Sequence, residues 1–265
     1  MNWRKPQPHR PMFGQKNEPF PATRFFDQLS FIGDPNVGCF VLETSEGLIL
    51  LDCMEPGEHY INMILQGLQD LSLDPHDLKA ILVTHGHGDH YGSADYFRKH
   101  FGCKIYMSSI DYKFARSDTG PMGALPFEIY DFVEDGDTFT LGDTSVHFFA
   151  TPGHTPGCLS FVFDVTDEGR KHTVALWGGT GIPRSHEDRE QYLASCHYFA
   201  DITAKMHVDA EIATHPFVDS SILRLQIIRT ITDGVPNPFV LGEENYKYYE
   251  ALFEHMAQEA LDSEK

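Results

Sequence analysis

Three histidines and an aspartate lie within six residues of this 265-residue chain, in the run Thr84-His85-Gly86-His87-Gly88-Asp89-His90. Histidine is the commonest protein ligand for zinc, and a carboxylate oxygen is its usual companion. The two glycines carry no side chains, so the backbone between the ligands can fold tightly around an ion. The spacing therefore predicts a metal site rather than a polar loop that is rich in histidine by chance.

Two further histidines stand in matching positions on the chain. His154 lies in the loop 151–157, which two Pro-Gly pairs restrict, and a strand is predicted on each side of it. His215 directly follows a strand predicted over Ala210–Ala213, as the histidine run follows one predicted over Lys79–Val83. Loops at the carboxyl ends of strands gather functional groups in α/β proteins, so these histidines are candidates for the same site.

The charge of the chain argues against several classes of partner. It has 39 acidic and 20 basic residues, and its formal net charge is −19. A protein that binds nucleic acid needs an excess of Lys and Arg to displace phosphate counterions, and an anionic membrane surface makes the same demand. We therefore expect no nucleic acid and no membrane as a partner. A small-molecule substrate is expected instead.

The sequence also bears on the cellular compartment. The first 20 residues lack the apolar stretch of a secretory signal, and no run of about 18 apolar residues predicts a transmembrane helix. The cysteines are odd in number and scattered, without a C-x-x-C pair: Cys39, Cys53, Cys103, Cys158 and Cys196. They are expected to be reduced and mostly buried. These features predict a cytoplasmic protein.

Residues 1–23 are rich in proline and predict an extended N-terminal arm, whereas residues 24–265 are expected to form a single domain. The irregular stretch Ser108–Asp137 is either a candidate lid or an ordinary connection. Strands and helices recur in two similar halves, which suits two sheets packed face to face with helices outside. Strands are predicted at Phe25–Ile32, Cys39–Thr44, Leu48–Leu51, Lys104–Met107, Ser145–Ala150, Leu159–Asp164 and Thr173–Trp177, and helices at 57–71, 92–100, 188–206 and 243–262.

Together these motifs resemble the metallo-β-lactamase-fold hydrolases. The resemblance covers roughly residues 25–218 and includes Leu50-Leu51-Asp52, the histidine run, the Pro-Gly loop around His154, and His215. It implies an α/β fold, an αβ/βα four-layer sandwich of two mixed β-sheets packed face to face with helices outside. The metals are then expected at one edge between the sheets.

The resemblance also implies two zinc ions per chain, each with its own ligands. His85, His87 and His154 are expected to bind the first ion, and Asp89, His90 and His215 the second. Asp52 is expected to accept a hydrogen bond from a ligand imidazole and so to fix its tautomer, unless it only forms the turn at a strand end.

Two departures from the family pattern stand out. Many members carry Gly-Asp-Thr after the strand that precedes Gly178, and that aspartate bridges both metals; here the sequence is Gly178-Gly179-Thr180. Glyoxalase-like thioesterases, typical acyl-homoserine lactonases and phosphodiesterases of this fold use the bridging aspartate. The histidine-rich third subclass of metallo-β-lactamases does without it, and this chain resembles that subclass most. The second departure is Cys53-Met54, where a small residue followed by glycine is common.

The implied activity is hydrolysis by a metal-bound hydroxide, which would open an amide or lactam bond, or an ester or lactone bond. Asp89 is the candidate catalytic residue, since it is placed to orient the hydroxide and shuttle a proton. Thr180, Arg184 and Ser185 are candidates for holding a substrate carboxylate, and Trp177 for lining an apolar pocket. Each of these substrate candidates has an alternative role as an ordinary loop or core residue.

Other functions remain open at this stage. A lactonase or esterase that acts on an intracellular metabolite is hard to separate from a β-lactamase-like enzyme. A mononuclear iron dioxygenase on the same fold is disfavoured by the complete second set of ligands. A non-catalytic metal-binding protein would keep the histidines but lack an open position for water. The proline-rich arm and the C-terminal helix are candidate contacts in a homo-oligomer.

Overall fold

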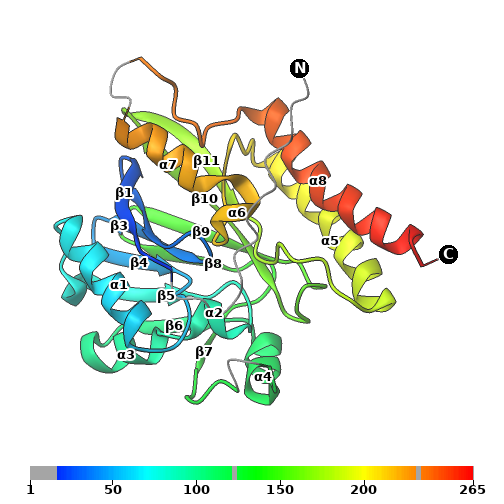
Figure 1. Cartoon of the computed structure of the whole chain (residues 1–265), viewed down its shortest axis with the longest axis horizontal. Coiled ribbons are helices and arrows are strands. Elements are labelled where there is room, and N and C mark those ends of the chain that lie inside the picture. The colour runs from blue at the N-terminus through cyan, green and yellow to red at the C-terminus, as the bar shows by residue number, and fades with distance from the viewer. Residues whose placement is uncertain (1–16, 121–123, 231–233, 265) are drawn as a thin grey trace.

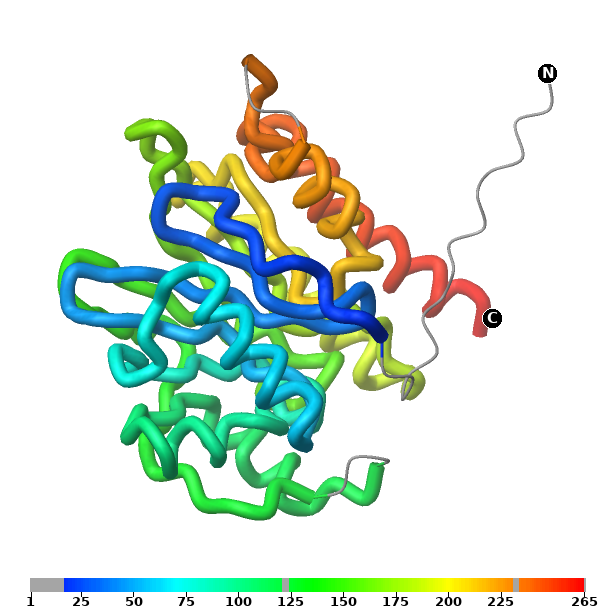
Figure 2. Tube along the Cα trace, turned by 60° about the vertical axis from the view of Figure 1, so that its left-hand side comes forward, coloured from blue at the N-terminus to red at the C-terminus, as the bar shows by residue number. Residues whose placement is uncertain are grey.

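The computed structural model describes residues 17–120, 124–230 and 234–264. Two mixed β-sheets pack face to face, and helices cover the outer face of each sheet (Figure 1). This arrangement confirms the α/β fold expected from the alternation of strands and helices. Figure 2, turned by 60° about the vertical axis, shows the first N-terminal strand (blue) next to the helix at 221–230 (orange).

The first sheet is antiparallel at one end and parallel at the other. Its first four strands form a meander, and the last three run parallel to the fourth. Parallel neighbours need crossover connections, which the helices between them supply. In order across the sheet the strands are β1 (Phe20–Phe26), β2 (Leu29–Gly33), β3 (Gly38–Thr44), β4 (Gly47–Leu51), β5 (Leu78–Leu82), β6 (Lys104–Met107) and β7 (Asp131–Phe132).

The second sheet has five strands in the order β12-β11-β10-β9-β8. All neighbours are antiparallel except β11 and β12, which run parallel because helix α5 (His186–Lys205) connects them. The bounds are β8 (Thr138–Leu141), β9 (Thr144–Ala150), β10 (Leu159–Asp167), β11 (Arg170–Leu176) and β12 (Ala210–Ile212).

Three hydrophobic clusters hold the layers together. The inner cluster lies between the sheets, where Phe31 and Leu51 of the first sheet face Phe148 and Phe161 of the second. One outer cluster packs α1 (Glu58–Asp70) and α3 (Ala94–Phe101) on the first sheet, and the other packs α5 and α8 (Glu243–Asp262) on the second. The remaining helices are η1 (Pro75–Asp77), α2 (Gly88–Tyr91), α4 (Ser109–Ser117), α6 (Pro216–Asp219) and α7 (Ser221–Thr230).

The structure corrects two predicted elements. The apolar run Phe25–Ile32 is not one strand, because a turn at 27–28 divides it between β1 and β2. The stretch Ser108–Asp137 is not irregular throughout, since it contains α4 and β7. The Ser108 hydroxyl caps α4 by accepting a hydrogen bond from the backbone N–H of Asp111 at 3.0 Å. This capping pair is a helix-start signal that the sequence carried.

The described residues also bear on the N-terminal arm and on the cysteines. Residues 1–16 of the predicted arm lie outside the described part of the chain, and β1 already begins at Phe20. All five cysteines are buried free thiols, as predicted. Among the helices that the structure describes, none combines the length and the apolar character needed to cross a membrane.

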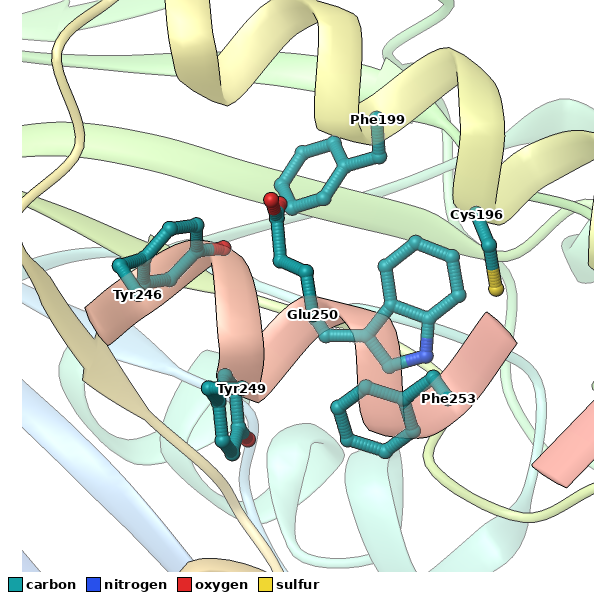
Figure 3. Close-up of a pocket in the computed structure, with 7 residues that line it drawn as sticks. Cys196, Phe199, Tyr246, Tyr249, Glu250 and Phe253 are labelled. Atoms are coloured by element: carbon teal, nitrogen blue, oxygen red, sulfur yellow. The ribbon is translucent and has the colours of Figure 1, made fainter. Parts of the chain in front are cut away.

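A buried carboxyl group lies in the outer cluster between α5 and α8. Figure 3 shows Glu250 among the rings of Phe199, Tyr246 and Phe253, where the residues line a cavity of about 10 Å³. The Thr203 hydroxyl donates a hydrogen bond to Glu250 Oε1 at 2.7 Å. Burial raises the pKa of Glu250 to about 7, although Thr203 and Tyr246 act in the opposite direction.

This raised pKa predicts a pH-dependent contribution to stability. Between the ordinary glutamate value and about pH 7, the folded chain holds a proton on Glu250 that the unfolded chain has released. Folding therefore loses stability as the pH rises through this window. Glu250→Gln keeps the acceptor for Thr203 and removes the titration. We expect its Tm to fall less than that of the wild type between pH 5 and pH 7.5, measured with chelator present.

Glu244→Gln is the matched control, because Glu244 is exposed in the first turn of the same helix. It should leave the wild-type difference in Tm between the two pH values unchanged. The same pH dependence in Glu250→Gln and in the wild type would contradict the assignment.

Candidate metal centre

The topology brings all six predicted ligands to one end of the two sheets. His85 and His87 follow β5, and Asp89 and His90 lie in the short helix α2 that comes next. His154 lies in the loop between β9 and β10. His215 follows β12 and precedes α6. These loops leave strands of both sheets at the same edge, so residues far apart in the sequence meet there.

The six side chains form two adjacent groups of three. His85, His87 and His154 make the first group, and Asp89, His90 and His215 make the second. Within each group the candidate ligand atoms all lie within 4.8 Å of one another. The rings of His85 and His90 are 3.8 Å apart between centroids, so the groups are in contact. The structure thus assembles the two ligand sets that the sequence predicted.

Hydrogen bonds fix which nitrogen each ring of the second group turns inward. His90 Nδ1 lies 2.6 Å from Asp52 Oδ2, and His215 Nδ1 lies 2.8 Å from the carbonyl oxygen of Asn36. A carbonyl only accepts, and an ionised carboxylate does too, so both Nδ1 atoms carry protons. The two Nε2 lone pairs then face each other at 3.3 Å. Two acceptors at this distance repel unless a proton or a cation lies between them.

The first group shows the same arrangement. His154 Nδ1 donates to the carbonyl oxygen of Gly181 at 2.7 Å, which leaves its Nε2 as an acceptor. The Thr84 hydroxyl donates to Asp52 at 2.8 Å, so it accepts from His85 Nδ1 at 3.0 Å. His85 Nε2 is then an acceptor, and it is buried without a hydrogen-bond partner in the described chain. Buried polar atoms without partners are rare and call for an explanation such as a bound ion.

The electrostatics favour neutral, ligand-competent rings in the first group. Burial lowers the pKa of His154 to about 3, with His87 acting in the same direction. Burial and the neighbouring ring of His90 lower the pKa of His85 well below its usual range. Burial opposes the charge of Asp89, yet His90 and His215 outweigh it and lower the pKa of that carboxyl. Neutral imidazoles and an ionised carboxylate are the forms that bind metals.

The two groups differ in their access to solvent. Asp89, His90 and His215 are all buried, whereas His87 and His154 are only half-buried. Phe114 packs edge-on against His87, and the exposed ring of Phe217 lies beside His215, with 5.3 Å between the ring centroids. The first group is therefore the more exposed of the two, and one aromatic ring lies beside a histidine of each group.

Asp52 makes the contact with a ligand imidazole that was predicted for it. Its Oδ1 accepts from the backbone N–H of Thr84 at 2.7 Å, and its Oδ2 holds His90. It lies just beyond β4 with φ of 59°, and Met54 follows with φ of 53°. This left-handed region costs about 1–2 kcal/mol for a residue other than glycine. Met54 thus adopts a conformation that glycine adopts without strain. The turn therefore keeps the backbone conformation that a glycine favours, although the sequence here is Cys53-Met54.

The donor set fits a pair of metal ions. Five imidazoles and one carboxylate are ligands of the kind that zinc prefers, and each group supplies three of them. Three protein ligands leave room for water or substrate, as in catalytic rather than structural zinc sites. The converging lone pairs and the buried Nε2 of His85 are the atoms that such ions would satisfy.

The residues predicted to contact a substrate lie in different surroundings. Trp177 is buried in the outer cluster, where it is among the residues that line the cavity beside Glu250, and its Nε1 donates to the carbonyl oxygen of Gly179 at 2.7 Å. Ser185 caps α5 by accepting from the backbone N–H of Asp188. Arg184 is exposed and Thr180 is half-buried in the same loop, whose Gly181 carbonyl holds His154. Thr180 and Arg184 thus stay candidates beside the first group.

Comparison with known families settles the membership of the chain. A family model described as the metallo-beta-lactamase superfamily matches residues 32–167, slightly more than half of the chain. The chain belongs to the metallo-beta-lactamase superfamily. The match begins in β2 and ends with β10, so it includes five of the six predicted ligands.

Individual members of the superfamily resemble the chain to different extents. The crystal structure of BJP-1, a subclass B3 metallo-beta-lactamase of Bradyrhizobium japonicum, is similar with a TM-score of 0.79 and 26% identity, and the alignment covers 92% of this chain and 95% of that one. Hydroxyacylglutathione hydrolase GloC of Haemophilus influenzae is 27% identical over 173 residues, which is 62% of this chain and 74% of GloC. The protein ML0493 of Mycobacterium leprae is 30% identical over 136 residues, or 46% of this chain, and the match spans 60% of that relative.

Gly179 departs from many superfamily members for a steric reason. A Cβ atom at this position would lie 2.4 Å from His154 Cβ, which is closer than side chains approach. The backbone cannot move aside easily, because Trp177 Nε1 and the Tyr192 hydroxyl both donate to the Gly179 carbonyl. An aspartate here would displace a predicted ligand of the first group.

Sequence reasoning missed Asp111, which lies on α4 in the stretch predicted to be either a lid or an ordinary connection. Its carboxylate is fully buried and accepts hydrogen bonds from the loops that carry the first group. Burial raises the pKa of this carboxyl, whereas the hydrogen bonds from Thr155, Gly86 and Gly157 act in the opposite direction. The Ser108-x-x-Asp111 capping pattern marks the helix, but nothing in the sequence ties Asp111 to the histidines.

The contact at Gly179 leads to a prediction. Gly179→Ala should push His154 away from His85 and His87, so that the first group binds metal more weakly. Overpacking of this kind costs about 1–3 kcal/mol of stability. Isothermal titration of the chelator-treated protein with Zn²⁺ and a thermal melt would measure both effects.

Gly169→Ala is the control, because the Cβ that it adds meets nothing within 4 Å. It has a positive φ of 76°, so some loss of stability is expected there without a loss of metal affinity. Unchanged zinc affinity in Gly179→Ala would contradict the steric argument.

Proposed function

We propose that this chain is a di-zinc hydrolase, β-lactamase-like, that opens an amide or lactam bond, or a related ester or lactone bond. The observation that carries the proposal is the pairing of two three-donor groups in contact, with inward lone pairs at 3.3 Å and a buried His85 Nε2 that has no partner in the described chain. Membership in a superfamily made up mostly of hydrolases supports it. The small-molecule substrate expected from the charge of the chain is part of the same proposal.

Two bound zinc ions would supply an activated water and polarise the scissile carbonyl group. The residues of the chain would orient the reactants and move the proton. One Asp89 oxygen lies 3.7 Å from His90 Nε2, and the other lies 3.7 Å from His215 Nε2. From there Asp89 can accept a hydrogen bond from the attacking water and receive its proton. Asp52 keeps His90 in the tautomer that leaves Nε2 free.

The surroundings of the centre bear on the substrate. The ring of Phe114 packs against His87 and the ring of Phe217 lies beside His215, which suits an apolar or ring-shaped group next to the reacting bond. Thr180 and Arg184 are placed on the loop beside His154 and are candidates for holding a carboxylate of that substrate. The similarity to the subclass B3 enzyme BJP-1 supports a β-lactam as the first substrate to test.

A thioesterase activity is the second candidate, because the chain is also similar to hydroxyacylglutathione hydrolase GloC. Gly179 weighs against it. The resemblance leads us to expect an aspartate that bridges both metals in such thioesterases, and the contact with His154 leaves no room for one here.

The test is hydrolysis of a chromogenic cephalosporin by the zinc-loaded protein. We expect chelator-sensitive turnover with kcat/KM above about 10⁴ M⁻¹s⁻¹, the lower end for evolved enzymes. His85→Ala and Asp89→Ala should each lower kcat by about 100-fold or more, since metal ions contribute several kcal/mol to such reactions. Circular dichroism would establish that both variants fold.

His255→Ala is the matched control, because His255 is exposed on α8 and its Nε2 lies 3.2 Å from Glu259 of the same helix. It should retain full turnover. Wild-type rates in Asp89→Ala with an unchanged zinc content would refute the assignment. A protein that binds two zinc ions but turns the cephalosporin over slowly would direct the search to lactones, esters and thioesters.

A further inference from the structure

The buried carboxylate of Asp111, which is not among the six predicted ligands, contacts both loops that carry the first group. Asp111 is the third residue after the helix cap Ser108, where an acidic side chain usually turns back to the start of its own helix. It turns away instead. Its Oδ2 accepts from the backbone N–H of Gly86 at 2.7 Å and from the Thr155 hydroxyl at 2.6 Å, and its Oδ1 accepts from the backbone N–H of Gly157 at 2.6 Å.

The three groups that donate hydrogen bonds to Asp111 lie close to the histidines of the first group in the sequence. Gly86 lies between His85 and His87, and Thr155 directly follows His154. One carboxylate therefore touches both loops that supply the first group. None of the three donors belongs to α2 or to the segment around His215, which supply the second group.

The chemistry of the contacts makes Asp111 hard to replace. All three partners donate, so only a group with two acceptor oxygens satisfies them. Hydrogen bonds to an ionised carboxylate are about twice as strong as neutral ones, and these lie in a fully buried place. An amide in its place would turn one N–H donor toward Gly157 or Gly86, so that one backbone N–H would lose its acceptor.

Close packing holds the helix itself against the same loop. The Ser108 hydroxyl donates to the Gly157 carbonyl at 2.7 Å while it caps α4. Added Cβ atoms would lie 2.8 Å from the Asp111 carbonyl oxygen at Gly86 and 2.4 Å from Ser108 Oγ at Gly157. Both loops thus approach the first turn of α4 as closely as backbones can, and Asp111 has little freedom to move.

We propose that Asp111 is a positioning residue that fixes the distance between the loop of His85 and His87 and the loop of His154. It thereby sets the metal affinity of the first group and leaves that of the second group unchanged. This inference rests on the proposed di-metal function, because it assigns a role toward ions that the two groups would bind.

The test is a titration of the chelator-treated, full-length protein with Co²⁺, followed by visible d–d absorption. His154→Ala and His215→Ala, each of which removes one ligand group, assign the two binding steps. In Asp111→Asn we expect the first-group affinity to fall by about 10–100-fold, as for other partners that orient metal ligands. The second-group affinity should stay within about twofold of the wild type.

Thr155→Val provides a milder change at the same place, because it removes one donor and leaves the carboxylate. It should weaken the first group by less than Asp111→Asn does, and it keeps the proposal testable if Asp111→Asn fails to fold. Asp209→Asn is the matched control: Asp209 accepts from the backbone N–H of Thr173 at 3.0 Å and contacts His172 Nδ1 at 2.6 Å, away from both groups. It should leave both affinities unchanged whatever it does to the Tm.

The outcomes separate the two proposals. Two Co²⁺ ions in the wild type with a selective loss in the Asp111 and Thr155 variants would support the inference. Equal losses at both groups, or none, would overturn it while leaving the di-metal function intact. A wild-type protein that binds no Co²⁺ would overturn the proposed function itself.

Discussion

The constraint on which the rest of this structure depends is the convergence of nitrogen lone pairs in a place with little water. His90 and His215 turn Nε2 atoms toward each other at 3.3 Å, and the Nε2 of His85 is buried beside them. Left alone, such acceptors repel and lose the hydrogen bonds that water would give them. Two bound cations, one at each group, would satisfy these acceptors, and folding and metal binding would then be coupled through these rings.

The backbone keeps these rings in place through contacts on their far sides. The carbonyl groups of Asn36 and Gly181 accept from His215 and His154, and the Asp52 carboxylate accepts from His90. Each contact fixes a tautomer as well as an orientation. These acceptors come from turns at the ends of different strands, so only the assembled sandwich brings them to the rings. Histidine spacing alone cannot arrange this.

The backbone is strained at the end of β4, where one side chain must reach two partners. Asp52 and Met54 both have positive φ values of 59° and 53° at the end of β4, directly under the centre. The turn must be sharp there, since Asp52 has to reach both the Thr84 backbone and the His90 ring. Strain of this kind persists where the surroundings hold it, and such places cluster at functional sites. Close packing also restricts the chain at Gly179, where an added Cβ would lie 2.4 Å from His154 Cβ.

Sequence reasoning reached the ligands because they are marked twice, by residue type and by their places after strong strand signals. His154 and His215 were found in this way although they lie 64 or more residues beyond His90 in the sequence. Sequence reasoning missed the nine-residue helix α4 because the glycines and prolines that follow it favoured an irregular segment. It missed the turn at 27–28 because apolar residues flank it on both sides. Trp177 lines a small cavity in the outer cluster, and the sequence could not say which cavity, because alternation along a strand does not say which face a residue at its end will take.

The two groups differ in their exposure to solvent, and this difference bears on how a chain with a large negative charge attracts a substrate. With two divalent ions bound, the carboxylates of Asp52, Asp89 and Asp111 would offset three of four positive charges, so the centre would stay electropositive in a chain of net charge −19. Field lines from such a centre emerge where the low-dielectric cover is thinnest. Among the six predicted ligands, the least covered are His87 and His154, which are half-buried. An acidic surface and attraction for an electron-rich carbonyl group are therefore compatible, because screening by salt limits the attraction to a short range around these two side chains.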